Sequence, residues 1–119
     1  GDYLTASRRH LIYTNWDKNK LHSVGYVDGR VIFSVGISSY LHETGVCCNG
    51  EGDIYVALSG DWSTGEIHRF DPDGKYIGCV IEACGTPYGI TLTPDDGDLV
   101  VAAGYSVKIF GNAQRQICK

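Results

Sequence analysis

The sequence predicts an all-β fold, a β-propeller of four-stranded antiparallel blades, and three observations predict it. Among 119 residues there are 16 Gly, eight Tyr and no Met, a composition typical of a protein rich in turns and strands. No apolar pattern with a helical period extends far enough to form a substantial helix. The sequence also repeats itself about every 40 residues, and four short strands in that length are typical of a propeller blade. A β-sandwich also has regularly spaced strands, but it gives no reason for one pattern to occur three times.

The repeat is clearest at Phe70 and Phe110, which each end an apolar segment. A polar turn follows both, and Ile77 and Ile117 then mark the next strands, so that equivalent residues lie 40 positions apart. The same comparison over the whole chain predicts three blades per chain, at approximately residues 3–36, 44–82 and 86–118.

Each predicted blade contains four strands in the same order. The first strands are residues 3–7, 44–48 and 86–93, and the second strands are residues 10–14, 53–59 and 98–103. The third strands are residues 20–24, 66–70 and 107–110, and the fourth strands are residues 30–35, 75–81 and 115–118. This alignment makes Ile12, Ile54 and Leu99 equivalent positions of the second strands.

Turn sequences occur at the expected places between these strands. Residues 49–53 and 93–98 join first strands to second strands, and residues 26–30 and 71–75 join third strands to fourth strands. Their Asp-Gly and Pro-Asp pairs supply the positive φ angles and the preset φ that tight hairpins need. These acidic segments lack the ligand spacing of an EF-hand, so we interpret them as hairpin turns and not as calcium loops.

Two segments resemble NHL-repeat blades. Residues 45–77 contain a Gly-Asp pair before an apolar strand and then the turn FDPDG, and residues 85–110 repeat the first half of this pattern. Residues 11–30 resemble instead the YWTD-type blades of lipoprotein-receptor ectodomains. NHL blades form the C-terminal domain of TRIM-type proteins, so the resemblance implies a propeller scaffold, but scaffold motifs imply little about activity. The RING and B-box zinc clusters of a TRIM ligase are absent from the sequence, so the resemblance implies no ligase activity.

NHL-type propellers usually have six blades, so the resemblance implies a ring larger than three blades can form. Three blades alone would leave exposed edges at the first and last blades. A second copy of the chain would complete a six-bladed ring and cover both edges, so we expect a homodimer. The alternative is that the chain is a piece of a longer propeller.

Charge and hydropathy argue against two classes of partner. The net charge is −4, whereas a nucleic-acid-binding protein needs a concentrated basic surface. No apolar run is long enough to span a membrane, so we expect no membrane insertion.

The chain begins with Gly1 rather than Met, which indicates a processed product or a fragment. Together with an odd number of cysteines, this favours a secreted protein over a cytoplasmic one.

The chain has five cysteines. Cys47 and Cys48 are adjacent on a predicted strand, so their side chains point to opposite faces and are not expected to bond each other. Cys79 and Cys84 flank the connection between the second and third blades and are disulfide candidates. Cys118, near the last predicted edge, is the candidate for a bond between chains. Ordinary buried thiols are the alternative for all five.

The candidate ligand site lies on the propeller face formed by the loops between second and third strands and between successive blades. Two of those loops carry a Trp beside an Asp. A Trp ring can stack on the C–H surface of a sugar while Asp and Asn bond its hydroxyls, and the same ring can anchor a protein partner. The alternative is that each Trp packs on a neighbouring blade. The candidate ligand-binding residues are Asn15, Trp16, Asp17, Tyr40, His42, Asp61, Trp62, Tyr88 and Tyr105.

The four histidines, His10, His22, His42 and His68, are scattered singly and lack a metal-binding spacing such as HExxH. His22 and His68 hold equivalent positions in their third strands, which we interpret as a structural repeat. We therefore expect no metal and no cofactor. The sequence contains neither a nucleophile elbow nor a phosphate-binding loop, so we predict no catalytic residues and no enzyme activity.

These features favour a non-enzymatic ligand-recognition propeller, and most of all a secreted, lectin-like protein that binds glycans through aromatic and Asp or Asn loop residues. The alternative is a TRIM-NHL-like module that recognises a protein substrate through the same loops. A third option is an NHL-like lyase or hydrolase, although the sequence shows no catalytic constellation for it.

Overall fold

The computed structural model describes residues 3–7, 10–15, 18–37, 41–60, 65–82 and 84–111. These residues form strands and turns, as the sequence predicts, and none of them belongs to a helix long and apolar enough to cross a membrane. The strands are β1 (Tyr3–Ser7), β2 (His10–Asn15), β3 (Lys20–Gly25), β4 (Val31–Gly36), β5 (His42–Cys48), β6 (Ile54–Ser59), β7 (Glu66–Phe70), β8 (Tyr76–Ile81), β9 (Pro87–Leu92), β10 (Asp98–Ala103) and β11 (Ser106–Gly111).

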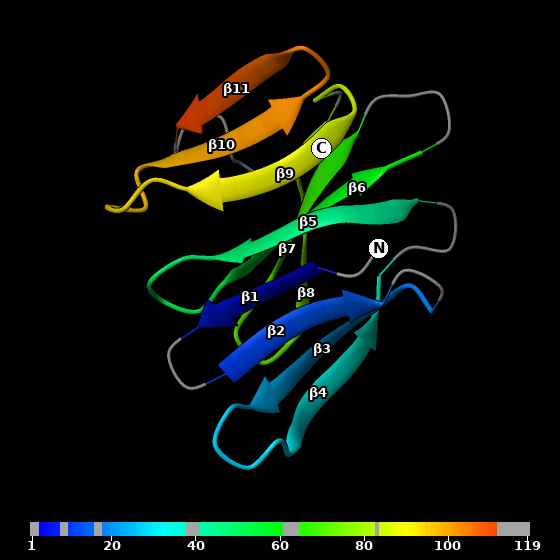
Figure 1. Ribbon diagram of the computed structural model, residues 1–119, viewed down its shortest axis with the longest axis vertical. Coiled ribbons are helices and arrows are strands. Elements are labelled where there is room, and N and C mark those ends of the chain that lie inside the picture. Colours follow the sequence, from blue (N-terminus) through cyan, green and yellow to red (C-terminus); the bar gives the residue numbers. More distant parts are fainter. Residues whose placement is uncertain are drawn as a thin grey trace.

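The strands form three antiparallel sheets, which we call blades 1, 2 and 3 (Figure 1). Blade 1 contains β1 to β4, blade 2 contains β5 to β8, and blade 3 contains β9 to β11, each in chain order across the sheet. The predicted fourth strand of blade 3, residues 115–118, lies outside the described residues. Strand β5 lies against β1 on one side and against β9 on the other. The first strand of each blade is therefore the innermost one, as in a propeller.

Blade 2 is buried on both faces because it lies between the other two blades. Every residue of its second strand, β6, is buried. On one face of β6, Ile54 and Val56 share a hydrophobic cluster with Ile12 of blade 1. On the other face, Tyr55 shares a cluster with Leu99 of blade 3. Burial of a large apolar side chain contributes roughly 1.5–3 kcal/mol to folding, so these two clusters hold the three blades together.

The register of blade 1 differs by one residue from the alignment that the sequence suggests. In blade 2, Ile54 lies two residues before the residue that pairs with His68. In blade 1, the residue two positions before the partner of His22 is Leu11, not Ile12. Ile12 and Ile54 meet in the cluster between blades 1 and 2, so Ile12 faces the following blade whereas Ile54 faces the preceding one. Because a shift of one residue moves a side chain to the opposite face of a sheet, the predicted equivalence of Ile12 and Ile54 is wrong.

The innermost strands of blades 2 and 3 each contain a β-bulge. In β5 the pairing with β6 shifts between Glu43 and Gly45, which leaves Thr44 as the extra residue. In β9 the shift leaves Tyr88 as the extra residue. The two strands approach closely just beyond the bulges, because a Cβ on Gly45 would lie 3.0 Å from Ile90 Cγ2. The absence of a side chain at Gly45 permits this contact, and the bulge re-aims the side chain of Tyr88.

Candidate functional site

We call the end of the molecule at which second strands lead into third strands the loop face. Asn15 ends β2 at this face, His42 begins β5, and Tyr105 lies in the turn between β10 and β11. Tyr88 is the bulge residue one position after the start of β9. The four candidate ligand residues that the structure describes therefore lie at the same end of their blades.

Tyr88 and Tyr105 are both exposed, with exposed fractions of 65% and 111% of the reference value. The backbone N–H of Gly104 donates a hydrogen bond of 3.2 Å to the carbonyl of Thr86. This bond ties the turn that carries Tyr105 to the segment that leads into β9. Gly104 has a φ of 59°, which glycine adopts without the steric cost of a side chain. Blade 3 thus presents two tyrosine rings to solvent from neighbouring segments.

Asn15 and His42 are half-buried, and His42 pairs with Ser59 at the end of β6. The residue after His42, Glu43, is completely buried. Burial of a carboxyl group requires compensating polar partners, so Glu43 is a candidate structural or functional residue at the axis side of blade 2. Sequence reasoning misses it because the predicted strand begins at residue 44, which leaves Glu43 in a loop.

The remaining candidates lie outside the described residues. They are Trp16, Asp17, Tyr40, Asp61, Trp62 and, among the disulfide candidates, Cys118. In the sequence, Trp16 and Asp17 directly follow Asn15, and Asp61 and Trp62 come two and three residues after Ser59. Their proposed roles stay predictions.

No disulfide joins Cys79 to Cys84 in the structure, so the predicted bridge is not supported. Cys79 pairs across strands with His68 and shares its face of blade 2. Cys84 belongs instead to the cluster with Tyr55, on the face toward blade 3. The sheet of blade 2 therefore separates the two side chains. Burial raises the pKa of the Cys84 thiol, and it raises the pKa of the Cys48 thiol to about 12, so both thiols are protonated at neutral pH.

A polar cluster of blade 2 combines residues that the sequence separates. Glu66, His68 and Cys79 place a carboxylate oxygen, a ring nitrogen and a sulfur within 4.8 Å of one another, and all three residues are half-buried. His68 Nε2 lies 2.8 Å from Glu66 Oε1, and His68 Nδ1 lies 2.8 Å from the hydroxyl of Tyr76. The Glu-x-His pair in the sequence indicates part of this cluster, because residues two apart on a strand point to the same face. Sequence reasoning misses the cluster because Cys79 joins it only through the pairing of β7 with β8.

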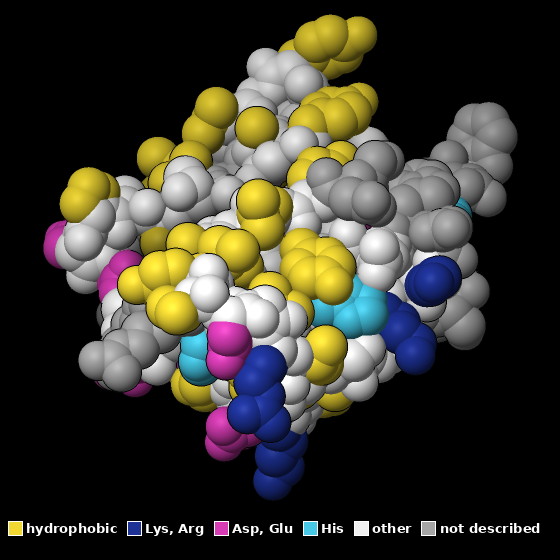
Figure 2. Space-filling model, turned by 60° about the horizontal axis from the view of Figure 1, so that its bottom comes forward, with side chains coloured by type: hydrophobic (Ala, Val, Ile, Leu, Met, Phe, Trp, Pro, Cys, Tyr) yellow, Lys and Arg dark blue, Asp and Glu magenta, His cyan; other side chains and the backbone are white. Residues whose placement is uncertain are grey.

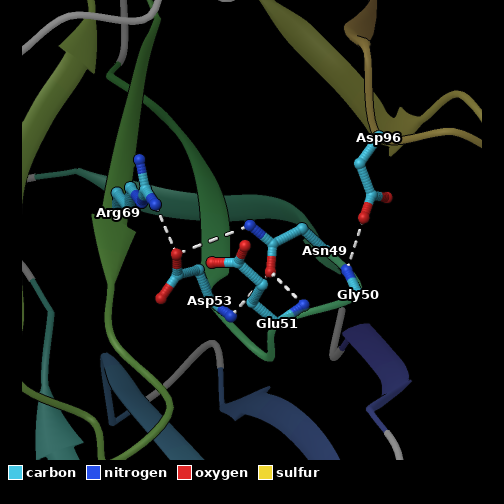
Figure 3. Close-up of polar contacts among 6 residues, drawn as sticks. All are labelled: Asn49, Gly50, Glu51, Asp53, Arg69 and Asp96. Carbon is cyan, nitrogen blue, oxygen red and sulfur yellow. Dashed lines mark hydrogen bonds and ion pairs between the residues drawn. The ribbon is translucent and has the colours of Figure 1, made fainter.

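At the opposite end of the blades, a polar network holds the turn between β5 and β6 (Figure 3). Asn49 Oδ1 accepts a hydrogen bond of 2.9 Å from the backbone N–H of Asp53, whose carboxylate pairs with Arg69 of β7. Asp96 accepts a hydrogen bond of 2.6 Å from the N–H of Gly50, which connects blade 3 to blade 2. Burial opposes the charge of Arg69, but its hydrogen bond with Asp53 and the nearby negative groups raise its pKa above the ordinary value. These acidic side chains stabilise hairpins, in agreement with their interpretation as turn residues.

No protein-family model matches the sequence, and no curated protein sequence matches it. Several solved structures are similar to the chain. One is a structure of a nidogen–laminin complex, with a TM-score of 0.70 and 19% identity, and the match covers 97% of this chain and 44% of that chain. Another is a protein from Bacteroides fragilis proposed to be a 6-phosphogluconolactonase, with a TM-score of 0.72 and 18% identity, covering 97% and 36% of the two chains. A functionally unknown protein from Desulfotomaculum acetoxidans has a TM-score of 0.66 and 22% identity, covering 92% and 37%.

These similarities concern the fold, because all three identities lie between 18% and 22%. They support an all-β, propeller-like architecture, in agreement with the three antiparallel sheets. No family match confirms the resemblance to NHL repeats. The chain spans less than half the length of each of these structures.

Proposed function

We propose that the chain belongs to a propeller that recognises a glycan on its loop face without catalysing a reaction. The observation that carries this proposal is the exposure of Tyr88 and Tyr105 on blade 3. Asn15 and His42 lie at the same end of blades 1 and 2. Exposed aromatic rings with polar side chains at the same end are the combination that a glycan site requires.

The chemistry of the four residues suits a sugar. An aromatic face packs against the C–H groups of a pyranose ring, and the tyrosine hydroxyl can exchange hydrogen bonds with a sugar hydroxyl. An Asn amide both donates and accepts, and so does a neutral His ring. Tyr105, at the tip of a hairpin, needs no rearrangement of a hydrophobic core to contact a ligand, because it is exposed in the free protein.

A glycan array tests this proposal with the variants Tyr88→Ala and Tyr105→Ala. The control is Tyr26→Ala, because Tyr26 has a similar exposed fraction, 57%, and lies in the β3–β4 turn at the opposite end of blade 1. We expect binding to a set of glycans that both loop-face variants reduce at least about tenfold, the typical effect of losing one good stacking contact. The Tyr26→Ala variant should bind as the wild type does. If the wild type binds no glycan, or if all three variants bind equally, the proposal is wrong.

A protein partner is the second candidate, and the hairpin-tip position of Tyr105 favours it. Exposed tyrosines are frequent anchors at protein interfaces, and a structurally similar chain comes from a nidogen–laminin complex. This reading corresponds to the TRIM-NHL-like recognition module that the sequence suggests. A protein microarray in which Tyr105→Ala abolishes one specific interaction, together with a negative glycan array, would favour the protein partner.

The outer blades expose apolar side chains that a closed ring would cover. In blade 1, Leu4, Val31 and Ile32 have exposed fractions of 67%, 68% and 44%. Figure 2 brings this end of the molecule forward and shows hydrophobic side chains gathered over it, with histidine surface among them. In blade 3, Val107 and Ile109 are 64% and 60% exposed. Exposed apolar faces of this kind are typical of surfaces that contact a partner.

We propose that a second copy of the chain covers these faces and completes a six-bladed ring. The open face of blade 3 would then meet the open face of blade 1 of the partner, twice in one dimer. Light scattering should report twice the chain mass for the wild type. Ile109→Glu should give a monomer, whereas Ile77→Glu, on the outermost strand of blade 2 and 40% exposed, should not. A folded wild-type monomer at all concentrations would contradict the dimer and favour a longer propeller as the source of the remaining blades.

A further inference from the structure

We propose that Glu66, His68 and Cys79 form a Zn²⁺ site on blade 2. The three ligand atoms already lie within 4.8 Å of one another. They combine a carboxylate, an imidazole and a thiol, which are the three side-chain groups that bind zinc in proteins. This proposal rests on residues of β7 and β8 and is independent of the proposed ligand site on the loop face.

The strands place the three ligands on one face of the sheet. Glu66 and His68 lie two residues apart on β7, so both side chains point to the same side. Cys79 of β8 is the cross-strand partner of His68. The pairing of β7 with β8 shifts on either side of this pair, between Ile67 and His68 and again after Arg69, and such irregularities often re-aim side chains at sites. The backbone therefore already brings the three groups together.

The two ring nitrogens of His68 have different partners, and Nδ1 lies beside a hydroxyl group as the free nitrogen of a metal-bound histidine often does. His68 Nε2 faces Glu66 Oε1 at 2.8 Å, so this nitrogen is the one that points toward the proposed ion. His68 Nδ1 lies 2.8 Å from the hydroxyl of Tyr76. Metal-bound histidines almost always donate their other ring N–H to a neighbouring oxygen, which sets the tautomer and the ring orientation. Tyr76 can accept that hydrogen bond, so it is a positioning residue for the site.

The site is accessible to an ion and needs only small movements to bind one. The side chains of His68 and Glu66 are 16% and 30% exposed, so water and ions reach them. Ligand atoms around a tetrahedral Zn²⁺ lie about 2.0–2.3 Å from the metal. The contact between Glu66 and His68 must therefore open slightly, while Cys79 must come closer. Three protein ligands leave a fourth position for water.

Binding of Zn²⁺ at this site releases a proton and involves no oxidation or reduction. The Cys79 thiol donates a hydrogen bond of 3.3 Å to the carbonyl of Ile81. When Zn²⁺ binds, the S–H bond breaks, its proton passes to solvent, and a Zn–S bond forms. His68 Nε2 gives up the proton that it donates to Glu66, and Nδ1 carries a proton in its place and donates it to Tyr76. The ring therefore stays neutral, Nε2 contributes its lone pair to the ion, and Glu66 contributes a carboxylate oxygen. Because a proton is released, zinc affinity should rise with pH.

Blade 1 contains a matched site that cannot bind zinc. His22 is the counterpart of His68, Lys20 stands two residues before it as Glu66 does in blade 2, and Ser34 is its cross-strand partner on the fourth strand. A Lys ammonium repels a cation and a Ser hydroxyl is a poor zinc ligand. The chain therefore provides its own control at the same register.

The experiment is a titration of the reduced, metal-free full chain with Zn²⁺, followed by calorimetry, and with Co²⁺, followed by absorption. We expect one Zn²⁺ per chain and a thiolate-to-cobalt charge-transfer band. Cys79→Ser should remove the band, and Cys79→Ser and Glu66→Gln should each weaken Zn²⁺ binding by at least about 100-fold, because loss of an outer-shell partner alone costs about 10–100-fold. Tyr76→Phe should weaken binding by about tenfold and keep the band.

Two control variants make the test specific. His22→Ala removes the matched histidine of blade 1, and Cys48→Ser removes a different thiol of blade 2; both should bind Zn²⁺ as the wild type does. Circular dichroism shows whether each variant is folded. The proposal is overturned if the folded wild type binds no Zn²⁺, if the band persists in Cys79→Ser, if Glu66→Gln binds as the wild type does, or if His22→Ala loses binding to the same extent as Cys79→Ser.

Discussion

Blades 1 and 2 place a histidine at the same position of the third strand, but its surroundings differ. In blade 1, His22 stacks on Tyr13 with ring centroids 4.8 Å apart, and its Nδ1 lies 2.9 Å from Ser34 Oγ. In blade 2, His68 lies 2.8 Å from the carboxylate of Glu66. In both blades the histidine lies on the third strand and faces the equivalent position of the fourth strand, but only blade 2 has a pairing shift directly before the histidine. The repeat therefore determines where the ring lies, and the neighbouring side chains determine what it can do.

The charge beside the histidine changes sign between the blades. The pKa of His22 is lowered first by burial and then by the positive charges of Lys20 and Lys18. In blade 2, Glu66 occupies the position that is equivalent to Lys20 in blade 1. A negative neighbour favours a cation beside the ring, and a positive neighbour disfavours it. The residues at two positions, Glu66 and Cys79 in blade 2 against Lys20 and Ser34 in blade 1, thus separate a candidate metal site from a site that disfavours metals.

Leucine truncation should give the largest difference between the two blades. Leu58 of blade 2 is completely buried, whereas Leu4 of blade 1 is 67% exposed. Leu58→Ala should lower the free energy of unfolding by about 2–5 kcal/mol, and Leu4→Ala should lower it by less than about 0.5 kcal/mol. Urea unfolding at low protein concentration measures both. Equal losses would show that the outer face of blade 1 is covered as fully as the interior of blade 2.

Replacement of two side chains in blade 1 should create a second metal site there. The double variant Lys20→Glu with Ser34→Cys gives His22 the carboxylate and the thiol that His68 has in blade 2, while Val31 still occupies the position of Tyr76. We expect the Zn²⁺ stoichiometry to rise from one to two per chain, because blade 1 then offers a carboxylate, an imidazole and a thiol. The matched control is Lys20→Gln with Ser34→Ala, which removes the charge without supplying ligands. An unchanged stoichiometry would show that the side chains at positions 20 and 34 alone do not determine whether His22 can bind Zn²⁺.

The residue after each histidine gives a smaller contrast in stability. In blade 2 this residue is Arg69, which pairs with the mostly buried carboxylate of Asp53. Arg69→Ala should cost about 1–2 kcal/mol, less than for a fully buried ion pair because the Arg69 side chain is 29% exposed. In blade 1 the residue is Ser23, whose buried Oγ has no hydrogen-bond partner among the described residues. Ser23→Ala should therefore leave the free energy of unfolding unchanged or raise it slightly. A comparable loss of that free energy in both variants would contradict the difference between the paired Arg69 and Ser23.

The smallest effect concerns the titration of His22. Its folded-state pKa lies below the ordinary value of 6.5, so the unfolded chain takes up a proton first as the pH falls. This group therefore contributes stability that is present above pH 6.5 and is lost as the pH falls through the folded-state pKa. Lys20→Gln should move the pKa of His22 upward, as measured by NMR titration of its ring protons. Lys75→Gln, in the turn of blade 2, is the control and should leave that pKa unchanged.

Much of the fold could be predicted from local signals in the sequence. Phe70 is the last residue of β7 and Phe110 the penultimate residue of the equivalent strand β11, and the acidic turns between strands lie where the sequence places them. The loop-face position of Tyr105 follows from the same strand order. The burial of Glu43 and the bulge at Tyr88 could not be predicted, because both depend on how the innermost strands pack and pair.

The all-β class, the order of the strands and the positions of the turns follow from the sequence alone, because strand periodicity and turn chemistry act over a few neighbouring residues. That Leu11 and not Ile12 is the counterpart of Ile54 follows only from the pairing of the folded strands. The tertiary structure also places Cys79 beside His68 and away from Cys84. Register and blade stacking depend on residues far apart in the chain, and a shift of one residue reverses the face on which a side chain lies. For that reason the chemistry of the two histidines depends on the pairing between strands as well as on the residue two positions before each of them in the sequence.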